Sequence, residues 1–200
     1  MRKIAITQRV TFDDRTGETR DCLDQRLSLM LLGLGFLPVP VPNSLGTNAV
    51  PVDSWLDAMS PTGIVLSGGG DVGVDSEKSR DDVERVLIAR AVRDRIPLLG
   101  ICRGMQHIGL VFGGSLRIVN NHVNCQHSLL GEYSHRVNSY HKFALSMCPD
   151  GFRVVAESPD GVIEAIAHRY LPILGLMWHP ERADPMSRED VDAISRLFGL

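Results

Sequence analysis

The segment that decides the fold is residues 95–104, which read RIPLLGICRG. Its first part, residues 95–101, is a short apolar run of the kind found in strands that are buried on both faces of a parallel sheet. Apolar residues then recur at helical spacing over residues 105–112, and two glycines at 113–114 follow as a stop signal. The segment therefore predicts a buried strand, a tight turn at Cys102 and a helix.

Cys102 lies in this turn, within the pattern G-x-C-x-G. Such a turn holds a nucleophile on a strained backbone clear of the sheet, and the start of the next helix stabilises a thiolate. Near the other end of the chain, the tripeptide HPE at residues 179–181 supplies a base, His179, and a carboxylate, Glu181, that can orient it. These residues indicate a cysteine hydrolase. The simpler alternatives are an inert buried Cys102 and a solvated Glu181.

A glycine-rich turn, GGGDVG at residues 68–73, follows a second apolar run. It formally matches the dinucleotide-binding fingerprint G-x-G-x-x-G, but its strand is not the first and residues 74–80 do not open as a packed helix. A Walker loop is excluded because no Gly-Lys-Ser/Thr ends the run. We interpret the turn as a source of backbone N–H groups for an oxyanion, with the N–H of Arg103 as the second donor.

Around these motifs the chain alternates strands and helices. Strands are expected at residues 4–8, 36–42, 63–67, 95–101 and 173–178, and further helices at 21–34, 52–59, 81–93 and 188–197. This order predicts a three-layer α/β fold with a mostly parallel central sheet, helices on both faces and a nucleophile elbow. Three prolines at alternate positions place the strand at 36–42 at or near an edge of the sheet.

The section from residue 115 to about 167 has a different pattern, because Asn, His, Gly and Pro interrupt it. Short antiparallel strands are expected there, at residues 116–119, 136–139, 152–155 and 162–166. A polar loop is expected through residues 13–17. The sequence has no internal repeat, low-complexity tract or linker, so residues 1–200 are expected to form one domain.

The composition excludes several classes of partner. With 21 Lys+Arg against 24 Asp+Glu, the net charge of -3 gives no electrostatic footprint for nucleic acid or an acidic membrane. No apolar stretch is long enough to span a bilayer, and the N-terminus turns polar too soon for a signal peptide. We therefore expect a cytoplasmic protein with no nucleic-acid or membrane partner.

The cysteines and histidines do not form a recognisable metal motif. No C-x-x-C pair or zinc-like spacing occurs, so Cys22, Cys125 and Cys148 are expected to be free thiols. Cys125 and His127 are a weak candidate pair, because i, i+2 spacing fixes no coordination geometry. Three histidines of the irregular section are expected either at the pocket or on the surface: His122, His127 and His135. We expect no metal and no organic cofactor.

With these motifs in place, the chain resembles the class I glutamine amidotransferase superfamily, and within it the γ-glutamyl hydrolases similar to γ-glutamyl-γ-aminobutyrate hydrolase. The resemblance lies in residues 4–9, 66–72, 100–106, 137–139, 160–165 and 178–181. It implies a catalytic triad of Cys102, His179 and Glu181, with oxyanion donors at Gly69 and Arg103. It also implies that Gln106, Asn138 and Ser139 hold the γ-glutamyl head. Arg103 favours this branch, because glutaminase subunits more often carry Leu after the nucleophile.

The chain departs from this branch at positions that concern the leaving group. Lys142 follows His141 where the branch often has a second His, Leu176 and Met177 stand where Val-Gln is frequent, and the loop after Val72 lacks the usual proline. A narrower resemblance comes from residues 20–26, which are similar to small bacterial hydrolases of the γ-glutamyl-CDP-amidate type. Those hydrolases act in surface-polysaccharide phosphoramidate synthesis.

The resulting hypothesis is a hydrolase that cleaves the amide bond of a small γ-glutamyl conjugate through a cysteine thioester. The first alternative is a glutaminase subunit that delivers ammonia to a separate synthetase chain, and the second is a non-catalytic binding protein. A homodimer and a synthetase partner are both compatible with the sequence. The leaving group is expected to meet the early loop and the irregular section, whose cationic candidates are Arg9, Arg15, Arg20, His127 and His135.

Overall fold

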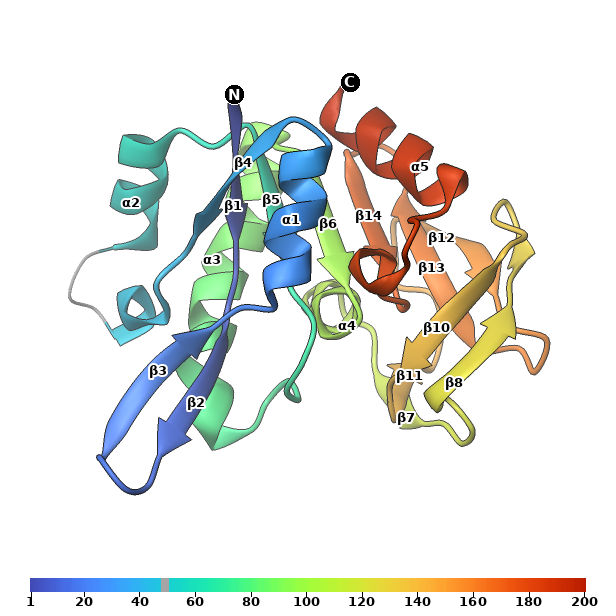
Figure 1. Ribbon diagram of the computed structural model, residues 1–200, viewed down its shortest axis with the longest axis horizontal. Helices are drawn as coiled ribbons and strands as arrows, with labels where there is room; N and C mark the ends of the chain where they lie inside the picture. The colour runs from blue at the N-terminus through green and yellow to red at the C-terminus, as the bar shows by residue number, and fades with distance from the viewer. Residues whose placement is uncertain (48–50) are drawn as a thin grey trace.

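A computed structural model describes residues 1–47 and 51–200, and its centre is an eight-stranded sheet in the order β4-β1-β5-β6-β14-β13-β12-β9 (Figure 1). The strands in that order are β4 (Phe36–Pro40), β1 (Arg2–Ile6), β5 (Gly63–Leu66), β6 (Leu98–Ile101), β14 (Ile173–Leu176), β13 (Ile163–His168), β12 (Phe152–Glu157) and β9 (Leu130–Gly131). The pairs from β4 to β14 are parallel, and those from β14 to β9 are antiparallel. The mostly parallel α/β sheet is therefore confirmed.

The proline-rich strand β4 lies at the outer end of the sheet and, among the strands that the structure describes, pairs with β1 alone. Pro38 and Pro40 have no N–H to donate, so a strand that carries them cannot serve in the middle of a ladder. The expectation of an edge strand is confirmed.

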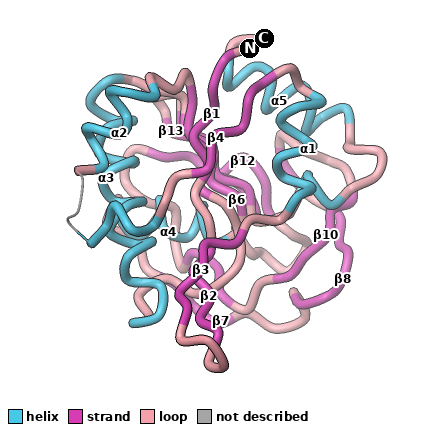
Figure 2. The backbone as a smooth tube through the Cα atoms, turned by 60° about the vertical axis from the view of Figure 1, so that its left-hand side comes forward, coloured by secondary structure: helices cyan, strands magenta, loops and turns pink. Residues whose placement is uncertain are grey.

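Within the described residues, five α-helices cover the two faces of the sheet and give three layers (Figures 1 and 2). One face carries α1 (Gln25–Gly33) and α5 (Arg188–Phe198). The other carries α2 (Val52–Met59), α3 (Lys78–Asp94) and α4 (Arg103–Val111). Alternate residues of β5 enter opposite cores: Val65 packs with α1 and α5, whereas Ile64 and Leu66 pack with the helices of the other face.

The polar loop expected at residues 13–17 is the turn of a β-hairpin, β2 (Arg9–Asp13) and β3 (Glu18–Cys22), which projects away from the central sheet (Figure 1). Sequence reasoning missed its strands because β3 is polar and largely exposed on both faces, so it has no alternating apolar pattern. The hairpin is held partly by Asp13, which pairs with Arg15 and Arg20.

The irregular section is antiparallel, as expected, but only part of it joins the central sheet. β13, β12 and β9 extend that sheet, whereas two small sheets stand beside it. These are β10 (Arg136–Tyr140) with β8 (Val123–Ser128), and β11 (Phe143–Leu145) with β7 (Leu116–Ile118). Short 3-10 helices complete the described chain at η1 (Asn43–Thr47), η2 (Asp75–Glu77) and η3 (Pro180–Arg182). Across residues 1–47 and 51–200, no helix has the length and apolarity that crossing a membrane requires.

Helix α5 begins at a side-chain cap, and its first turn is hydrogen-bonded to a residue that follows the central strand β14. Ser187 Oγ accepts a hydrogen bond from Asp190 N at 3.0 Å, and Asp190 Oδ1 accepts one from Trp178 Nε1 at 3.0 Å. Trp178 is buried at the end of β14, two residues beyond its last strand residue. The cap therefore fixes α5 against the strand that leads to His179.

We expect Ser187→Ala to lower the free energy of unfolding by about 1 kcal/mol, because it removes the acceptor of a helix N-cap. Urea unfolding followed by circular dichroism measures the difference. Ser54→Ala, at an exposed position of α2, is the matched control and should change the free energy by about 0.5 kcal/mol or less. Equal losses in the two variants would show that the Ser187 cap has no special role.

Candidate active site

Cys102 and His179 come together because they follow two neighbouring parallel strands. Ile101 of β6 lies opposite Leu176 of β14, so both strands end at the same edge of the sheet. The backbone N–H of Cys102 continues this pairing and donates to Leu176 O at 2.6 Å. Cys102 and His179 are thus placed side by side by the register of the sheet.

Cys102 has φ 50° and ψ -105°, a strained conformation for a residue with a side chain. Helix α4 begins at the next residue, so the buried thiol lies at the positive end of the helix dipole. The turn is tight: a Cβ atom at Gly100 would lie 2.7 Å from the backbone of Gly104. The sequence predicted this strand–turn–helix arrangement, and the structure has it.

His179 and Glu181 form a buried hydrogen-bonded pair. The ring Nδ1 donates to Glu181 Oε1 at 2.7 Å, which directs the other ring nitrogen toward Cys102. Burial of the ring opposes protonation, but hydrogen bonds with Cys102 and Glu181, together with their negative charges, raise the pKa of His179 to about 9. The imidazolium form is therefore favoured at neutral pH beside the thiol.

Asn138 fixes the backbone of His179. Its Nδ2 donates to His179 O at 2.8 Å, and its Oδ1 accepts from His179 N at 2.9 Å. The ring of Tyr140 packs edge-on against the imidazole, with the centroids 5.7 Å apart. These contacts explain how a histidine beyond the end of a strand keeps one orientation.

The glycine-rich turn that follows β5 lies against Cys102 and His179. A Cβ atom at Gly68 would come within 2.6 Å of His179 Cε1, so only glycine fits there. Arg80 on α3 holds this turn in place, because its guanidinium donates to Ser67 O and Gly69 O at 2.6 Å each. The position of the turn is thus fixed by a buried cation.

Glu84 connects Arg80 to helix α4. Its Oε1 accepts from Arg80 Nε at 2.9 Å, and its Oε2 contacts Arg103 Nη1 and His107 Nδ1, each at 2.6 Å. Burial opposes ionisation of Glu84, but the charges of Arg80 and Arg103, with the bond to His107, hold its pKa well below the usual range. Arg103 also pairs with Asp81. Sequence reasoning missed Arg80, Glu84 and Asp81, which look like ordinary surface charges of an amphipathic helix.

A cavity of about 360 Å³ opens beside Cys102. Gln106 lines it and donates from Nε2 to Phe143 O at 2.9 Å. The remaining lining residues are Gly69, Gly70, Asp71, Val123, Tyr140, His141, Lys142, Phe143, His179 and Arg182. A smaller cavity of about 170 Å³ shares Gly69, His179 and Arg182 with it and is also lined by Arg9.

Two residues expected at the substrate have other partners. The Asn138 side chain is engaged by the His179 backbone, and the buried Ser139 hydroxyl donates to His122 O at 2.7 Å. Neither side chain is among the residues that line the cavity beside Cys102, and each is hydrogen-bonded to a neighbouring backbone group.

Of the cationic side chains expected near the leaving group, only some lie at the two cavities. Arg9 lies against Gly69. Arg15 and Arg20 pair with acids of the hairpin, and His135 pairs with Glu189. His127 belongs to a separate histidine cluster. Lys142 and Arg182, which the expectation did not include, line the larger cavity.

The fold and this site are those of a cysteine-dependent enzyme, and comparison with known proteins identifies its family. The family model "Glutamine amidotransferase class-I" matches residues 38–191, more than half of the chain. The chain belongs to the class I glutamine amidotransferase family.

Individual relatives agree with this assignment. The γ-glutamyl-CDP-amidate hydrolase of Campylobacter jejuni is 30% identical over 204 residues, which cover 98% of each chain. A glutamine-hydrolysing GMP synthase subunit from Methanocaldococcus jannaschii is 29% identical over 155 residues, which cover 72% of this chain and 78% of the relative. Among solved structures, a protein of Thermoplasma acidophilum proposed to be a GMP synthase subunit shares the fold, with a TM-score of 0.73 and 24% identity. That match covers 100% of this chain and 93% of the other.

We expect Glu181→Gln to lower the pKa of His179 from about 9 toward its ordinary value, because the variant keeps the shape of the side chain but removes the negative charge. NMR titration of the His179 ring measures the change. Glu189→Gln, which alters the partner of His135, is the control and should leave the pKa of His179 in place. An unchanged His179 titration in Glu181→Gln would contradict this account of the pair.

Proposed function

We propose that the protein hydrolyses the amide bond of a small γ-glutamyl conjugate and releases glutamate through a thioester on Cys102. The observation that carries the proposal is the placement of Cys102, at a strand–helix elbow, beside the hydrogen-bonded pair of His179 and Glu181 and at one cavity. A thiol held next to an imidazolium reacts as the thiolate, the nucleophilic form. The names of both relatives support cleavage of a γ-glutamyl amide, since one describes a γ-glutamyl hydrolase and the other a glutamine-hydrolysing enzyme.

The proposed reaction has two steps. First, Cys102 Sγ attacks the γ-carbonyl carbon, and the C–N bond breaks as protonated His179 gives its proton to the leaving nitrogen. Second, the neutral imidazole takes a proton from water, whose oxygen attacks the thioester carbon. The C–S bond then breaks, glutamate leaves, and Cys102 returns as the thiolate beside protonated His179.

The negative charge that develops on the carbonyl oxygen needs donors. We assign this role to the backbone N–H groups of Gly69 and Arg103. Gly69 lines the cavity with Cys102, and Arg103 is the first residue of α4, where N–H groups have no acceptor within the helix. Loss of one such donor typically costs about 3 kcal/mol of transition-state stabilisation. The Arg80 and Glu84 network supports this assignment because it holds both the turn and the start of α4.

We place the γ-glutamyl head in the larger cavity, against Gln106 and the wall formed by Tyr140 and Phe143. Asn138 and Ser139 then contribute indirectly, by holding the His179 backbone and the His122 carbonyl.

We propose further that the leaving group carries phosphate, as in a nucleotide amidate. Lys142 lines the larger cavity, Arg9 lines the smaller one, and Arg182 lines both. The two cavities share Gly69 and His179. Guanidinium groups match phosphate oxygens in a bidentate manner. The relative that spans the same length is named for γ-glutamyl-CDP-amidate, which supports a substrate of this class.

The second candidate function is a glutaminase subunit that delivers ammonia to a separate synthetase chain. The Methanocaldococcus relative, which is one subunit of its synthase, favours it. Activity of the isolated chain discriminates between the two. A hydrolase turns over γ-glutamyl conjugates alone, whereas a delivering subunit is nearly silent without its partner.

We expect Cys102→Ala to reduce glutamate release by at least about 10³-fold, because the variant lacks the nucleophile. A panel of γ-glutamyl conjugates, with γ-aminobutyrate, polyamine and nucleotide-amidate leaving groups, supplies the assay. Cys148→Ala removes a half-buried thiol outside both cavities and should keep full activity. Full turnover by Cys102→Ala would overturn the mechanism.

We expect Arg9→Met to raise the KM for a nucleotide amidate by about 10-fold or more, because a hydrogen bond to a charged group contributes about 1.5–3 kcal/mol. The KM for glutamine, which lacks the phosphates, should change little. Arg15→Met, on the exposed hairpin turn, is the control and should affect neither substrate. Equal effects of Arg9→Met on the two substrates would place Arg9 outside the leaving-group site.

A further inference from the structure

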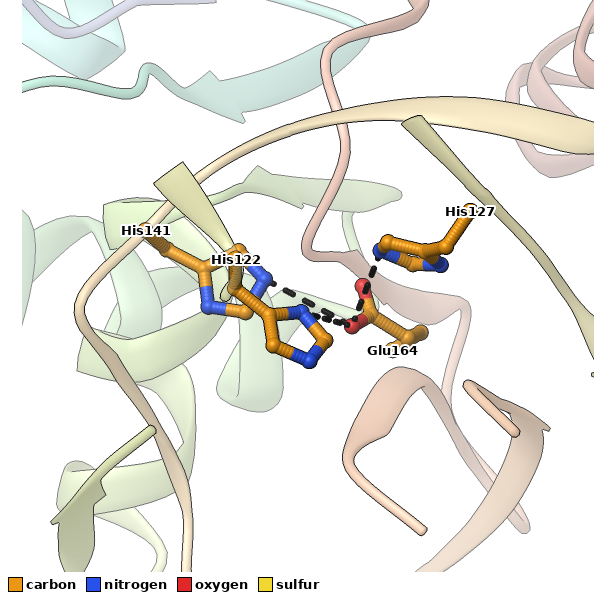
Figure 3. Close-up of side chains that lie close together, drawn as sticks. All are labelled: His122, His127, His141 and Glu164. Atoms are coloured by element: carbon orange, nitrogen blue, oxygen red, sulfur yellow. Dashed lines mark ion pairs between the residues drawn. The ribbon is translucent and has the colours of Figure 1, made fainter. Parts of the chain in front are cut away.

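Four side chains from three segments of the chain meet around Glu164: His122, His127, His141 and Glu164 (Figure 3). His122 directly precedes β8 and His127 lies within it, whereas His141 follows β10 and Glu164 belongs to β13. One ligand atom from each residue lies within 4.8 Å of all the others. Glu164 is fully buried, His122 and His141 are each 3% exposed, and the His127 side chain is 14% exposed.

The distances fit a tetrahedral metal site. Glu164 Oε1 lies 3.2 Å from His122 Nδ1, 3.4 Å from His127 Nε2 and 3.5 Å from His141 Nε2. Bonds of about 2.0–2.1 Å from zinc to nitrogen and oxygen give a tetrahedron whose edges are about 3.3 Å long. The three separations from Glu164 Oε1 are therefore those expected between ligand atoms of a four-coordinate site.

The outer nitrogen of each ring has its own acceptor. His122 Nε2 lies 3.1 Å from Asp160 Oδ2, His141 Nδ1 lies 3.1 Å from Phe143 O, and His127 Nδ1 lies 3.3 Å from the backbone O of the following residue. An acceptor at the outer nitrogen places the N–H there and leaves a lone pair on the inner nitrogen. Metal-binding histidines are oriented in this way, by a carbonyl or carboxylate at the nitrogen away from the metal.

The inner atoms have no hydrogen-bond partner. The inner nitrogens of the three histidines and both carboxylate oxygens of Glu164 are buried and unsatisfied. Three lone pairs and a carboxylate that face one another repel, and a buried unpaired carboxylate is costly. A cation among them would satisfy all four residues.

We propose that His122, His127, His141 and Glu164 bind one divalent transition metal ion, of which Zn²⁺ fits best. Imidazole nitrogen and carboxylate oxygen are zinc ligands, and four protein ligands close the tetrahedron without an open position, as in structural zinc sites. The ion ties β8 and the end of β10 to β13 of the central sheet. His141 also lines the cavity beside Cys102, so the ion stiffens the wall that faces the substrate.

A second group, Asp81, Glu84 and His107, has similar spacing but different chemistry. Its carboxylates are bound by the guanidinium groups of Arg80 and Arg103, which supply the positive charge. In this second group, therefore, arginine side chains have the place that we give to a metal ion in the first group. The sequence suggested Cys125 and His127 as a possible metal-binding pair, and the four-residue cluster replaces this pair. Cys125 Sγ donates to Asn121 O at 3.0 Å, and Cys125 is not among the converging ligands.

The first test is the metal content of the whole chain, purified without a histidine tag. Inductively coupled plasma mass spectrometry should find about one zinc ion per chain after desalting. Protein treated with a chelator and reloaded with Co²⁺ should show the strong visible bands of tetrahedral cobalt, without a thiolate charge-transfer band. Wild-type protein that takes up neither Zn²⁺ nor Co²⁺ would overturn the proposal. It would mean that protons, rather than a metal ion, join Glu164 to the three histidines.

Variants then locate the ion. Glu164→Gln should lose the bound zinc, whereas Cys125→Ser should retain it. Asp160→Ala changes an exposed residue that orients His122, so it should fold normally and weaken zinc affinity by about 10–100-fold. Glu157→Ala, at a nearby exposed carboxylate, is the matched control and should bind zinc like the wild type. Unchanged zinc affinity in both Glu164→Gln and Asp160→Ala would place the metal elsewhere and overturn the assignment.

Discussion

The parallel pairing of β6 with β14 is the constraint on which the site depends. It brings the carboxyl ends of two strands to one edge, so that Cys102 and His179 meet although they are far apart in the sequence. The hydrogen bond from Cys102 N to Leu176 O carries the pairing into the strained turn itself. A rigid sheet positions reacting groups more accurately than loops can, and this is where an α/β fold places its chemistry.

A buried ionic network holds the glycine-rich turn and the start of α4, the two parts of the site that the pairing of β6 with β14 does not hold. Glu84 joins Arg80, beneath the glycine turn, to Arg103, at the start of α4. Taking these charges out of water is costly, and such a network contributes less to stability than its number of contacts suggests. Its benefit is positional, because it fixes two backbone segments relative to Cys102. The histidine cluster at Glu164 reaches the cavity through His141, which lines it.

The sequence predicted the features whose signals are local. Residues 95–104 contain strand, turn and helix signals in direct succession, and the prolines of β4 mark an edge. The β2–β3 hairpin escaped prediction because its second strand is polar on both faces. The contacts of Asn138 are with the backbone of His179, and the histidine cluster gathers side chains from β8 and the residue before it, from β13 and from the residue after β10. Such long-range contacts leave no spacing pattern, so only the folded chain shows them.

The central claim is that the fold makes Cys102 the nucleophile for γ-glutamyl carbonyl groups. Reaction with an electrophilic glutamine analogue, followed by peptide mass spectrometry, tests it most directly, because all four cysteines are free thiols in one chain. The account predicts one adduct per chain, on Cys102, with Cys22, Cys125 and Cys148 unmodified under the same conditions. An unmodified Cys102, or an adduct spread over the other cysteines, would contradict it.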